Sequence, residues 1–289
     1  SGGTGTGKTT ERDYMMSIDW KLMSIASIQQ SFDAQGGAIN QRFEIKYLVS
    51  EMMAQSVIDF ISPYMDPDPQ GRVYPVTSLY LDNDPMSMYW SSEMGERNRY
   101  KLRLRSYTDA EGFQVFAEVK RRLDRVVLKT RVAIRNDQID ALLNGTGTTE
   151  DIALHPEKEK SINDLAYFRD LLDTFQAKPC ATVRYMREAY VSMDGEPLRI
   201  TFDRDLCCIP TTEYSDEIWS AQAFWRTLPQ VPVVLELKFT DHYPSWVQQL
   251  IQRFGLERTS MAKYVECVKT LRSDGVPIAQ ELQGQGVVQ

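Results

Sequence analysis

Charged and apolar residues alternate along several short segments of this 289-residue chain, and this alternation limits the possible folds more than any other feature. Successive side chains of a β-strand point to opposite faces of a sheet, so such a segment has one apolar and one charged face. The pattern occurs in the runs 43–47, 100–105, 117–120, 198–203 and 235–239. Three of them repeat the order Glu-x-Lys, starting at Glu44, Glu118 and Glu236. The sequence therefore predicts a sheet with one apolar and one charged face.

Cations concentrate in one part of the chain. Residues 97–131 hold eleven Lys/Arg and four Asp/Glu, a net charge of +7 in a chain whose formal total is −7. The acidic total argues against binding of nucleic acid through bulk charge, so no nucleic-acid partner is expected. Two like charges 4 Å apart repel by roughly 4 kcal/mol at an effective dielectric of ~20. A face this rich in cations therefore needs an anion or interleaved carboxylates.

The charged face allows two interpretations. It is typical of an antiparallel sheet with one solvent-exposed side. Alternatively, the sheet closes into a barrel whose interior carries the charges and holds one small ligand. A phosphate chain would match the binding geometry of Lys and Arg, and the Glu residues could hold a hard divalent cation. The residues alone leave both interpretations open.

Hydrophobic periodicity predicts the elements that surround this face. Helices are expected at 14–34, 50–62, 161–176, 244–254 and 260–272, strands at 41–49, 76–82, 98–108, 113–121, 126–135, 181–193, 197–204 and 231–240, and loops at 66–75 and 145–160. Ser50 is expected to cap the second helix, and Met193-Asp194-Gly195-Glu196 to form a hairpin turn. Because short turns join most successive strands, the predicted fold class is α+β, an antiparallel β-barrel with flanking helices.

No linker divides residues 41–272, so a single domain is expected there. The predicted organisation is a flexible tail at 1–13, an N-terminal helix within 14–39, one domain at 40–272 and a disordered tail at 273–289. Gly2, Gly7, Lys8 and Thr9 match the letters of a P-loop, but a P-loop needs a buried strand before its first glycine. Only one residue precedes Gly2, so no nucleotide-binding loop is expected.

Other residue types narrow the class of protein. The four cysteines show no CxxC spacing, which predicts reduced thiols in a cytoplasmic protein. No run of 18 apolar residues is present, and no apolar leader opens the chain, so neither a membrane segment nor a secretory signal is expected. His155 and His242 are the only histidines, which argues against a multi-His metal site.

At the alternating segments the chain resembles a known family. The motifs that carry the resemblance are Arg42-Phe43-Glu44-Ile45-Lys46-Tyr47, Tyr100-Lys101-Leu102-Arg103-Leu104-Arg105, Phe116-Ala117-Glu118-Val119-Lys120, Lys129-Thr130-Arg131, Tyr185-Met186-Arg187, Leu198-Arg199-Ile200-Thr201-Phe202-Asp203, Leu235-Glu236-Leu237-Lys238 and Ser260-Met261-Ala262-Lys263-Tyr264. Their order resembles that of the polyphosphate polymerase domain of the vacuolar transporter chaperone family, one of the triphosphate tunnel metalloenzymes. The resemblance implies a tunnel lined by basic residues that binds triphosphate and a divalent metal. It also implies an enzyme that transfers the γ-phosphoryl group of ATP to polyphosphate.

The resemblance further implies roles for the residues that match the family's motifs. The catalytic, phosphate-binding cations would be Lys46, Arg103, Arg105, Lys120, Lys129, Arg187, Arg199 and Lys263. Further substrate-binding residues would be Ser260, Lys238, Lys101, Glu118 and Glu44. Glu236 would hold the metal, Mn²⁺ or Mg²⁺. ATP and inorganic polyphosphate would be the ligands, and a membrane or transporter partner stays open.

One position departs from the wider superfamily. The fuller first-strand signature is Glu-x-Glu-x-Lys, whereas Arg42 stands here in the first position and leaves Glu44-x-Lys46. The change favours the polymerase branch of the superfamily over the simple triphosphatases. It also removes one possible ligand of a second metal.

Several alternatives remain at this stage. A hydrolase would use the same tunnel but admit water, and a non-catalytic module would only bind polyphosphate or a nucleotide. Arg103 and Arg105 could instead form ion pairs in a plain sheet face. Arg122 and Arg184 are expected to be surface charges that face away from the tunnel.

Overall fold

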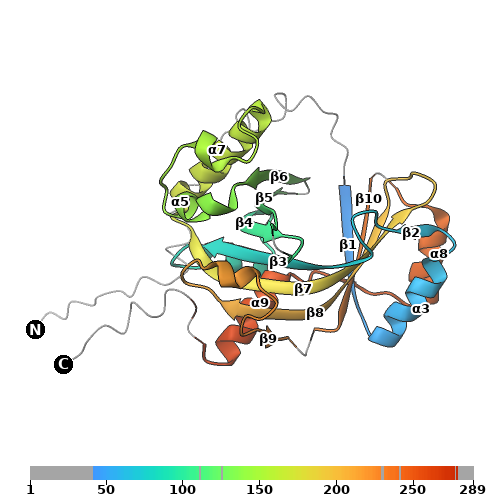
Figure 1. The fold of residues 1–289 in the computed structure, drawn as a ribbon. Coiled ribbons are helices and arrows are strands. Elements are labelled where there is room, and N and C mark those ends of the chain that lie inside the picture. Colours follow the sequence, from blue (N-terminus) through green and yellow to red (C-terminus); the bar gives the residue numbers. More distant parts are fainter. Residues whose placement is uncertain are drawn as a thin grey trace, which may run out of the picture. The chain divides into compact units, whose positions relative to one another are not determined.

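The alternating segments form the strands of one antiparallel sheet in the computed structural model. The structure describes residues 42–110, 112–124, 126–228, 231–240, 242–276 and 278. The strands are β1 (Arg42–Val49), β2 (Met65–Pro67), β3 (Val73–Asp82), β4 (Asn98–Ser106), β5 (Val115–Leu123), β6 (Val126–Ile134), β7 (Lys178–Ser192), β8 (Arg199–Pro210), β9 (Arg226–Thr227), β10 (Val233–Thr240) and β11 (Arg258–Thr259). Their order is β11-β1-β10-β8-β7-β3-β4-β5-β6, with β2 on β7 and β9 on β8 (Figure 1).

The sheet curves so that its two ends approach each other across the charged face. Within the described residues no hydrogen-bonded ladder joins β6 to β1 or β11. Nevertheless, Nζ of Lys120 in β5 lies 3.4 Å from Oε2 of Glu44 in β1. Twist and coiling bring distant strands of a large sheet together in this way. The predicted α+β class, a barrel-like antiparallel tunnel with flanking helices, is confirmed, and side chains rather than strand pairing connect its two ends.

Helices cover both faces of the sheet. They are α3 (Glu51–Ile61), α4 (Ser87–Glu93), α5 (Ile139–Leu143), α6 (Thr149–Ile152), α7 (Glu159–Phe175), α8 (Ser245–Arg253) and α9 (Lys263–Ser273), with the 3-10 helices η1 (Asn136–Gln138) and η2 (Asp216–Trp219). Ser50 caps α3 as predicted, because its Oγ accepts a 3.2 Å hydrogen bond from the amide of Met53. In the part of the chain that the structure describes, none of the helices has the length and apolar character needed to cross a bilayer.

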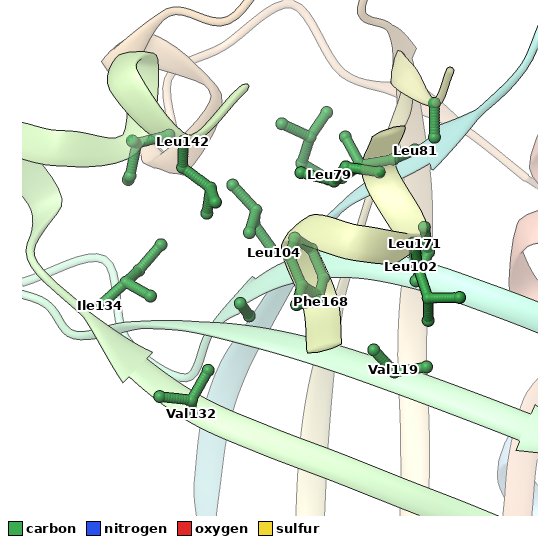
Figure 2. Close-up of a cluster of buried hydrophobic side chains, with 14 of the residues drawn as sticks. Leu79, Leu81, Leu102, Leu104, Val119, Val132, Ile134, Leu142, Phe168 and Leu171 are labelled. Atoms are coloured by element: carbon green, nitrogen blue, oxygen red, sulfur yellow. The ribbon is translucent and has the colours of Figure 1, made fainter. Parts of the chain in front are cut away.

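One apolar core lies between α5–α7 and the apolar face of β3–β6. Tyr100, Leu102 and Leu104 alternate along β4 and are buried in this core. Figure 2 shows Leu102 and Leu104 close to Phe168 of α7, with Val119 of β5 beside them. Each fully buried side chain of this size contributes about 1.5–3 kcal/mol to the free energy of unfolding. This core fixes which face of β4 and β5 carries the charges.

A second apolar core holds the other half of the sheet. Tyr47, Leu235 and Leu237 of β1 and β10 pack there against Val57 of α3 and Leu250 of α8. Because these residues alternate with Lys46 and Glu236, the charged residues of β1 and β10 point to the opposite face. The two cores therefore orient the charges of both halves of the sheet toward the same side.

A third apolar cluster lies on the same face as the charges. Tyr80 of β3 and Val234 of β10 share that face with charged neighbours, and α4 and α9 cover them with Tyr89, Tyr264 and Val268. The helix α9 consequently lies over part of the charged face. Its first residue is Lys263, so the helix begins at the edge of the charged region.

The differences from the predicted elements concern short segments. β3 begins at Val73 and α6 lies at Thr149–Ile152, both inside predicted loops, and α4 was not expected. Seven residues give too little periodicity to predict α4 from sequence. Its first amides are instead held by the carboxylate of Asp82, which accepts from Met88 and Tyr89 at 3.0 and 2.9 Å. The tail predicted at 1–13, the helix predicted at 14–39 and most of the tail predicted at 273–289 lie outside the described residues.

Candidate functional site

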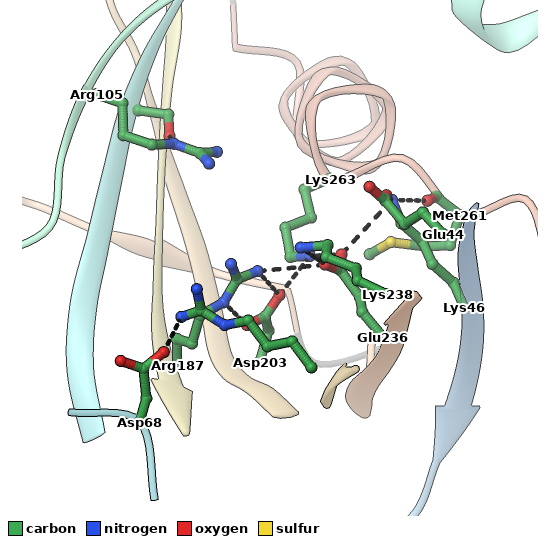
Figure 3. Close-up of polar contacts among 12 residues, drawn as sticks. Glu44, Lys46, Asp68, Arg105, Arg187, Asp203, Glu236, Lys238, Met261 and Lys263 are labelled. Atoms are coloured by element: carbon green, nitrogen blue, oxygen red, sulfur yellow. Dashed lines mark hydrogen bonds and ion pairs between the residues drawn. The ribbon is translucent and has the colours of Figure 1, made fainter. Parts of the chain in front are cut away.

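Cations from three strands and the start of α9 meet around one buried carboxylate, Glu236 (Figure 3). Its Oε1 lies 3.0 Å from Nζ of Lys263 and 3.6 Å from Nζ of Lys46. Its Oε2 lies 2.9 Å from Nζ of Lys238 and 3.4 Å from Nη2 of Arg187. Burial opposes the charge of Glu236, but these four cations outweigh it and hold its pKa well below the usual value. Glu236 is therefore ionised at neutral pH, within an excess of positive charge.

Asp203 of β8 orients two of these cations. Nε and Nη2 of Arg187 donate to its two oxygens at 2.6 and 2.7 Å, and Nζ of Lys263 lies 2.7 Å from Oδ2. The bidentate pair fixes the plane of the guanidinium group. Burial alone would lower the pKa of Lys263, but Asp203 and Glu236 raise it above the usual value. Arg187 and Lys263 thus stay charged and keep a defined orientation.

Lys46 of β1 lies between two carboxylates. Its Nζ is 3.2 Å from Oε1 of Glu44 and 3.6 Å from Oε1 of Glu236, and it donates to the carbonyl oxygen of Met261 at 3.3 Å. Burial would raise the pKa of Glu44, but Lys120, Lys46 and other cations lower it far below the usual value. This carboxylate is the link to the other half of the sheet, because it also contacts Lys120.

Glu118 of β5 is the centre of a second group of cations. Its side chain is 1% exposed, and its Oε2 accepts from Nε and Nη2 of Arg103 at 2.8 and 2.6 Å. Its Oε1 lies 2.8 Å from Nζ of Lys129 and 3.7 Å from Nε of Arg131. Arg105 reaches Oε2 at 3.9 Å. Burial opposes the charge, yet these cations hold the pKa of Glu118 far below its usual range.

The arginines of β4 also contact hydroxyl groups of β3. Nε of Arg105 donates to Oγ of Ser78 at 2.8 Å, and Nη1 of Arg103 donates to the hydroxyl of Tyr80 at 3.3 Å. Burial would raise the pKa of Tyr80, but Arg103 and Arg105 lower it overall. Ser78 and Tyr80 therefore help to fix these guanidinium groups between the two carboxylate centres.

Arg199 is the first residue of β8. Its Nη2 lies 2.6 Å from Oδ2 of Asp68 and donates to the hydroxyl of Tyr74 at 2.8 Å. Its Nε is buried and has no hydrogen-bond partner in the described part of the chain. An unpaired buried donor is costly, so this nitrogen is suited to an incoming acceptor such as a phosphate oxygen.

Lys101 differs from the other predicted site residues. It lies on the charged face of β4, directly across from Lys120, and no carboxylate of the described residues lies within ion-pair distance of it. Burial lowers the pKa of Lys101 well below its usual value, and Lys46 and Lys120 lower it further. An anion bound nearby would relieve this repulsion.

Ser260 lies apart from both carboxylate centres. It is exposed and lines a cavity of about 360 Å³ together with Leu48, Glu93 and Lys269. Within the described residues its hydroxyl forms no hydrogen bond to the cations of the site. The structure thus brings together all of the predicted charged residues, while Ser260 lies beside the segment that leads into α9.

Arg122 and Arg184 were predicted to be surface charges that face away from the tunnel. For each of them one part of this prediction is wrong. Arg122 is exposed but lies on the same face as Lys120, because both alternate with core-facing neighbours along β5. Arg184 does lie on the face opposite Arg187, yet it is buried. Its Nη1 donates to Oγ1 of Thr77 at 3.1 Å, and its Nη2 lies 2.7 Å from Oδ2 of Asp109. A buried arginine needs such partners, and the sequence pattern did not indicate them.

Asp203, Asp68 and Arg131 also belong to the site, although they were not predicted from the sequence. Alternation in the run 198–203 does place Asp203 on the charged face. Its partners come from β7 and α9, however, and no local pattern indicates those contacts. Asp68 lies in a predicted loop, so it carried no strand signal. Arg131 shares the face of Lys129 by parity, and its guanidinium carbon lies 3.7 Å from the ring centroid of Phe116.

The donor set of the described residues limits the kind of metal site that is possible. No group of three or more His, Cys, Asp or Glu side chains converges there. Glu44 and Glu236, however, both contact the ammonium group of Lys46. Mg²⁺ commonly takes only one or two carboxylates and completes its shell with water and substrate phosphates. These residues therefore fit a divalent ion that binds together with phosphate, and they do not fit an ion held by protein ligands alone.

The remaining property of the site is its charge. Glu118 and Glu236 each contact four cations. Glu44 and Asp203 contact two each, and Asp68 contacts Arg199. The arrangement can bind a compact polyanion through many charge-assisted hydrogen bonds. In the described part of the chain, no hydrogen bond joins a serine hydroxyl or a cysteine thiol to His155 or His242.

Comparison with known proteins relates the chain to a family. The family model described as the VTC domain matches residues 41–272. The chain is also similar to the vacuolar transporter chaperone complex subunit 4 of Schizosaccharomyces pombe, with 24% identity over 238 residues. That match covers 70% of this chain and 32% of the relative, so the chain spans about a third of the relative's length.

Solved structures show more distant likenesses. A protein from Pyrococcus horikoshii has a TM-score of 0.43 and 14% identity, covering 79% of this chain and 98% of that one. A candidate adenylate cyclase from Bacillus halodurans has a TM-score of 0.42 and 14% identity, covering 77% of this chain and 95% of that one.

Proposed function

This chain belongs to the VTC domain family, and on that premise we propose that it is a polyphosphate polymerase. In this proposal it transfers the γ-phosphoryl group of ATP to a growing inorganic polyphosphate chain. The observation that supports the proposal is the convergence of cations from separate strands on Glu118 and Glu236, with positive charge in excess at both centres. A triphosphate or a phosphate chain is the ligand whose charge and oxygen geometry match that arrangement.

The proposed reaction needs no side-chain nucleophile. The terminal oxygen of polyphosphate, or of orthophosphate at initiation, attacks the γ-phosphorus of ATP in line. The bond between that phosphorus and the β,γ-bridging oxygen breaks, and ADP leaves with the electron pair. Phosphoryl transfer has a loose transition state, so positioning and charge neutralisation supply most of the rate enhancement.

The contacts within the site support specific roles. Arg103, Arg105 and Arg187 would bind the equatorial oxygens, and each is already oriented by Glu118, Ser78 or Asp203. Donors fixed before the reaction stabilise developing charge without reorganisation. Lys46 and Lys120 would neutralise the developing charge. The remaining phosphate contacts would come from Lys101, Lys129, Arg199, Lys238, Ser260 and Lys263.

A divalent metal, Mn²⁺ or Mg²⁺, is part of the proposal. Glu236 would hold it, with Glu44 nearby, and the bound ion would polarise phosphate oxygens as a Lewis acid. To accept the ion, Glu236 would exchange its contact with Lys46 or Lys238, which are the more exposed of its four partners.

Product analysis distinguishes the proposed activity from its alternatives. The full chain is incubated with ATP and Mn²⁺, and the products are separated by chain length. Long phosphate chains, with one ADP released for each phosphoryl group transferred, would support the polymerase. Orthophosphate alone would indicate a triphosphatase or polyphosphatase that admits water. Tight binding without turnover would indicate a polyphosphate- or nucleotide-binding module.

The proposal also concerns the ligands and partners of the protein and its location in the cell. Its small-molecule partners would be ATP and inorganic polyphosphate, and the identity of any transporter that receives the polymer stays open. We place the protein in the cytoplasm. The four free, buried cysteines support this location, because reduced thiols are typical of reducing compartments.

A further inference from the structure

The charged face of β4 and β5 continues beyond the two carboxylate centres. Lys101 of β4 lies opposite Lys120 of β5, and Lys120 lies opposite Lys129 of β6. Two residues further from the site, Arg99 lies opposite Arg122. These five residues form a continuous basic row across three strands, which we call the outer basic row.

The two outermost residues of this row lack carboxylate partners. Nη1 of Arg99 donates to the backbone oxygen of Glu96, and Nε of Arg122 donates to the backbone oxygen of Asp124 at 2.9 Å. No described carboxylate lies within ion-pair distance of either guanidinium group. Burial lowers the pKa of Arg99, and the charge of Arg122 lowers it further. Like charges placed directly opposite each other destabilise a strand pair, so this arrangement opposes folding unless an anion binds there.

The position of the outer basic row indicates which part of a ligand it would meet. Along β4, Arg103 lies four positions after Arg99, which corresponds to about 14 Å at ~3.4 Å per residue. A ligand that ends at the two carboxylate centres would therefore leave Arg99 without contact. An extended chain that leaves this site along β4 and β5 would pass Lys101 and Lys120 first, and then Arg99 and Arg122.

The row also lacks the features that recognise a single-stranded nucleic acid. Proteins that bind such strands place aromatic rings on the basic track, where successive bases stack. The outer basic row contains only Lys and Arg, and the residue opposite Arg122 on β6 is Val127. A polyanion without bases is the ligand that fits this surface.

We propose that Arg99 and Arg122 bind the distal part of an inorganic polyphosphate chain whose terminal phosphates occupy the carboxylate-centred site. This inference rests on the proposed function and extends it, because it assigns a direction to the bound polymer and a separate subsite to its distal units. It predicts that affinity rises with chain length and that these two arginines account for the rise.

The test compares binding of tripolyphosphate and of long-chain inorganic polyphosphate by titration calorimetry. The variant is Arg99→Gln/Arg122→Gln. The control is Arg135→Gln/Arg258→Gln, which changes the net charge equally at exposed arginines off the row. We expect the variant to lose about tenfold in affinity for the long chain, the sum of two modest ion contacts. Tripolyphosphate binding should be retained, and the control should bind both ligands like the wild type.

Other results would overturn the inference. If the variant lost affinity equally for both ligands, or for neither, Arg99 and Arg122 would not form a distal subsite. An equal loss in the control would indicate bulk charge instead of a specific row. If the wild type bound neither ligand, the proposed function would fail together with this inference. If the wild type bound both ligands and only the predicted difference were missing, this inference alone would fail. The single variant Arg122→Gln, whose side chain is exposed, gives the same comparison should the double variant fold poorly.

Discussion

Nζ of Lys120 in β5 and Oε2 of Glu44 in β1 lie 3.4 Å apart, although 76 positions separate them in the chain. Their strands stand near opposite ends of the sheet order, with β10, β8, β7, β3 and β4 between them. The contact therefore exists only because the sheet curves around its charged face. It brings the Glu118 and Glu236 centres to one side of the molecule, where a single extended ligand could contact both.

Glu236→Gln tests the proposed metal site. The substitution removes the charge of an oxygen ligand while keeping the size of the side chain. We expect the rate of ATP-dependent polymer formation to fall at least tenfold, since even indirect loss of a metal-ligand partner has that effect. Binding of metal-free tripolyphosphate should be kept or strengthened, because one negative charge is gone. Glu266→Gln on α9 is the control, and unchanged turnover in Glu236→Gln would refute the metal role.

Arg103→Ala tests the role of the β4 arginines in phosphate binding. A charge-assisted hydrogen bond contributes about 1–3 kcal/mol, so the affinity for tripolyphosphate should fall by that amount. Arg121→Ala is the matched control. Arg121 lies on the opposite face of the sheet from Arg103, over the ring of Tyr100 on the core side of β5. Equal losses in both variants would mean that only net charge matters, contrary to the proposed contact.

Glu118→Gln tests whether the second centre is built for an anion. The change leaves Arg103 and Lys129 without a buried counter-charge, and the free energy of unfolding should fall by about 3–5 kcal/mol. Urea unfolding measures this loss. Tripolyphosphate should restore much of the stability, since it supplies negative charge to the same cations. Glu213→Gln, at an exposed position, should leave the midpoint unchanged.

The lowered pKa of Glu118 also predicts how the stability of the protein depends on pH in the acid range. The folded-state pKa of Glu118 lies below its unfolded value of about 4.3. Its contribution is therefore complete above that pH and is lost as the pH falls through the folded-state pKa. Wild-type stability should decline below about pH 4.3, and the decline should be shallower in Glu118→Gln. Parallel pH profiles for the two proteins would contradict this assignment.

Binding of polyphosphate should take up protons at alkaline pH. Burial lowers the pKa of Lys101, Lys120 and Lys129 from the usual value, so these amines lose their protons at a lower pH than a free lysine does. A bound polyanion favours the charged form and raises these pKa values. Calorimetry in two buffers of different ionisation enthalpy should show proton uptake, with affinity falling as the pH rises toward 10. Lys101→Met should reduce the uptake, and heats independent of the buffer would exclude this coupling.

The charged face could be predicted from sequence because strand parity is a local property. Knowing that Ile45 and Leu237 are apolar is enough to place Lys46 and Glu236 on the other face. The charge excess of residues 97–131 likewise follows from composition. What could not be predicted is which cation shares which carboxylate. Those contacts depend on the curvature of the sheet and on where α9 begins, and neither leaves a periodic signal.

Lys263 and Asp203 illustrate this limit. The helix predicted at 260–272 contains Lys263, but only the observed start of α9 puts its ammonium group against Asp203 and Glu236. Ser260 shows the opposite case. Its motif implies a phosphate contact, yet its hydroxyl lies beside the separate cavity near Leu48.

The start of α9 joins two environments through one peptide bond. Lys263 belongs to the ionic site, whereas the next residue, Tyr264, is buried in the third apolar cluster and donates to Oδ2 of Asp82 at 2.7 Å. A substitution of Tyr264 would therefore displace Lys263 without touching any ligand. In a mutational survey scored by activity alone, such a residue would be mistaken for part of the catalytic machinery. Measuring thermal stability alongside turnover separates the two classes.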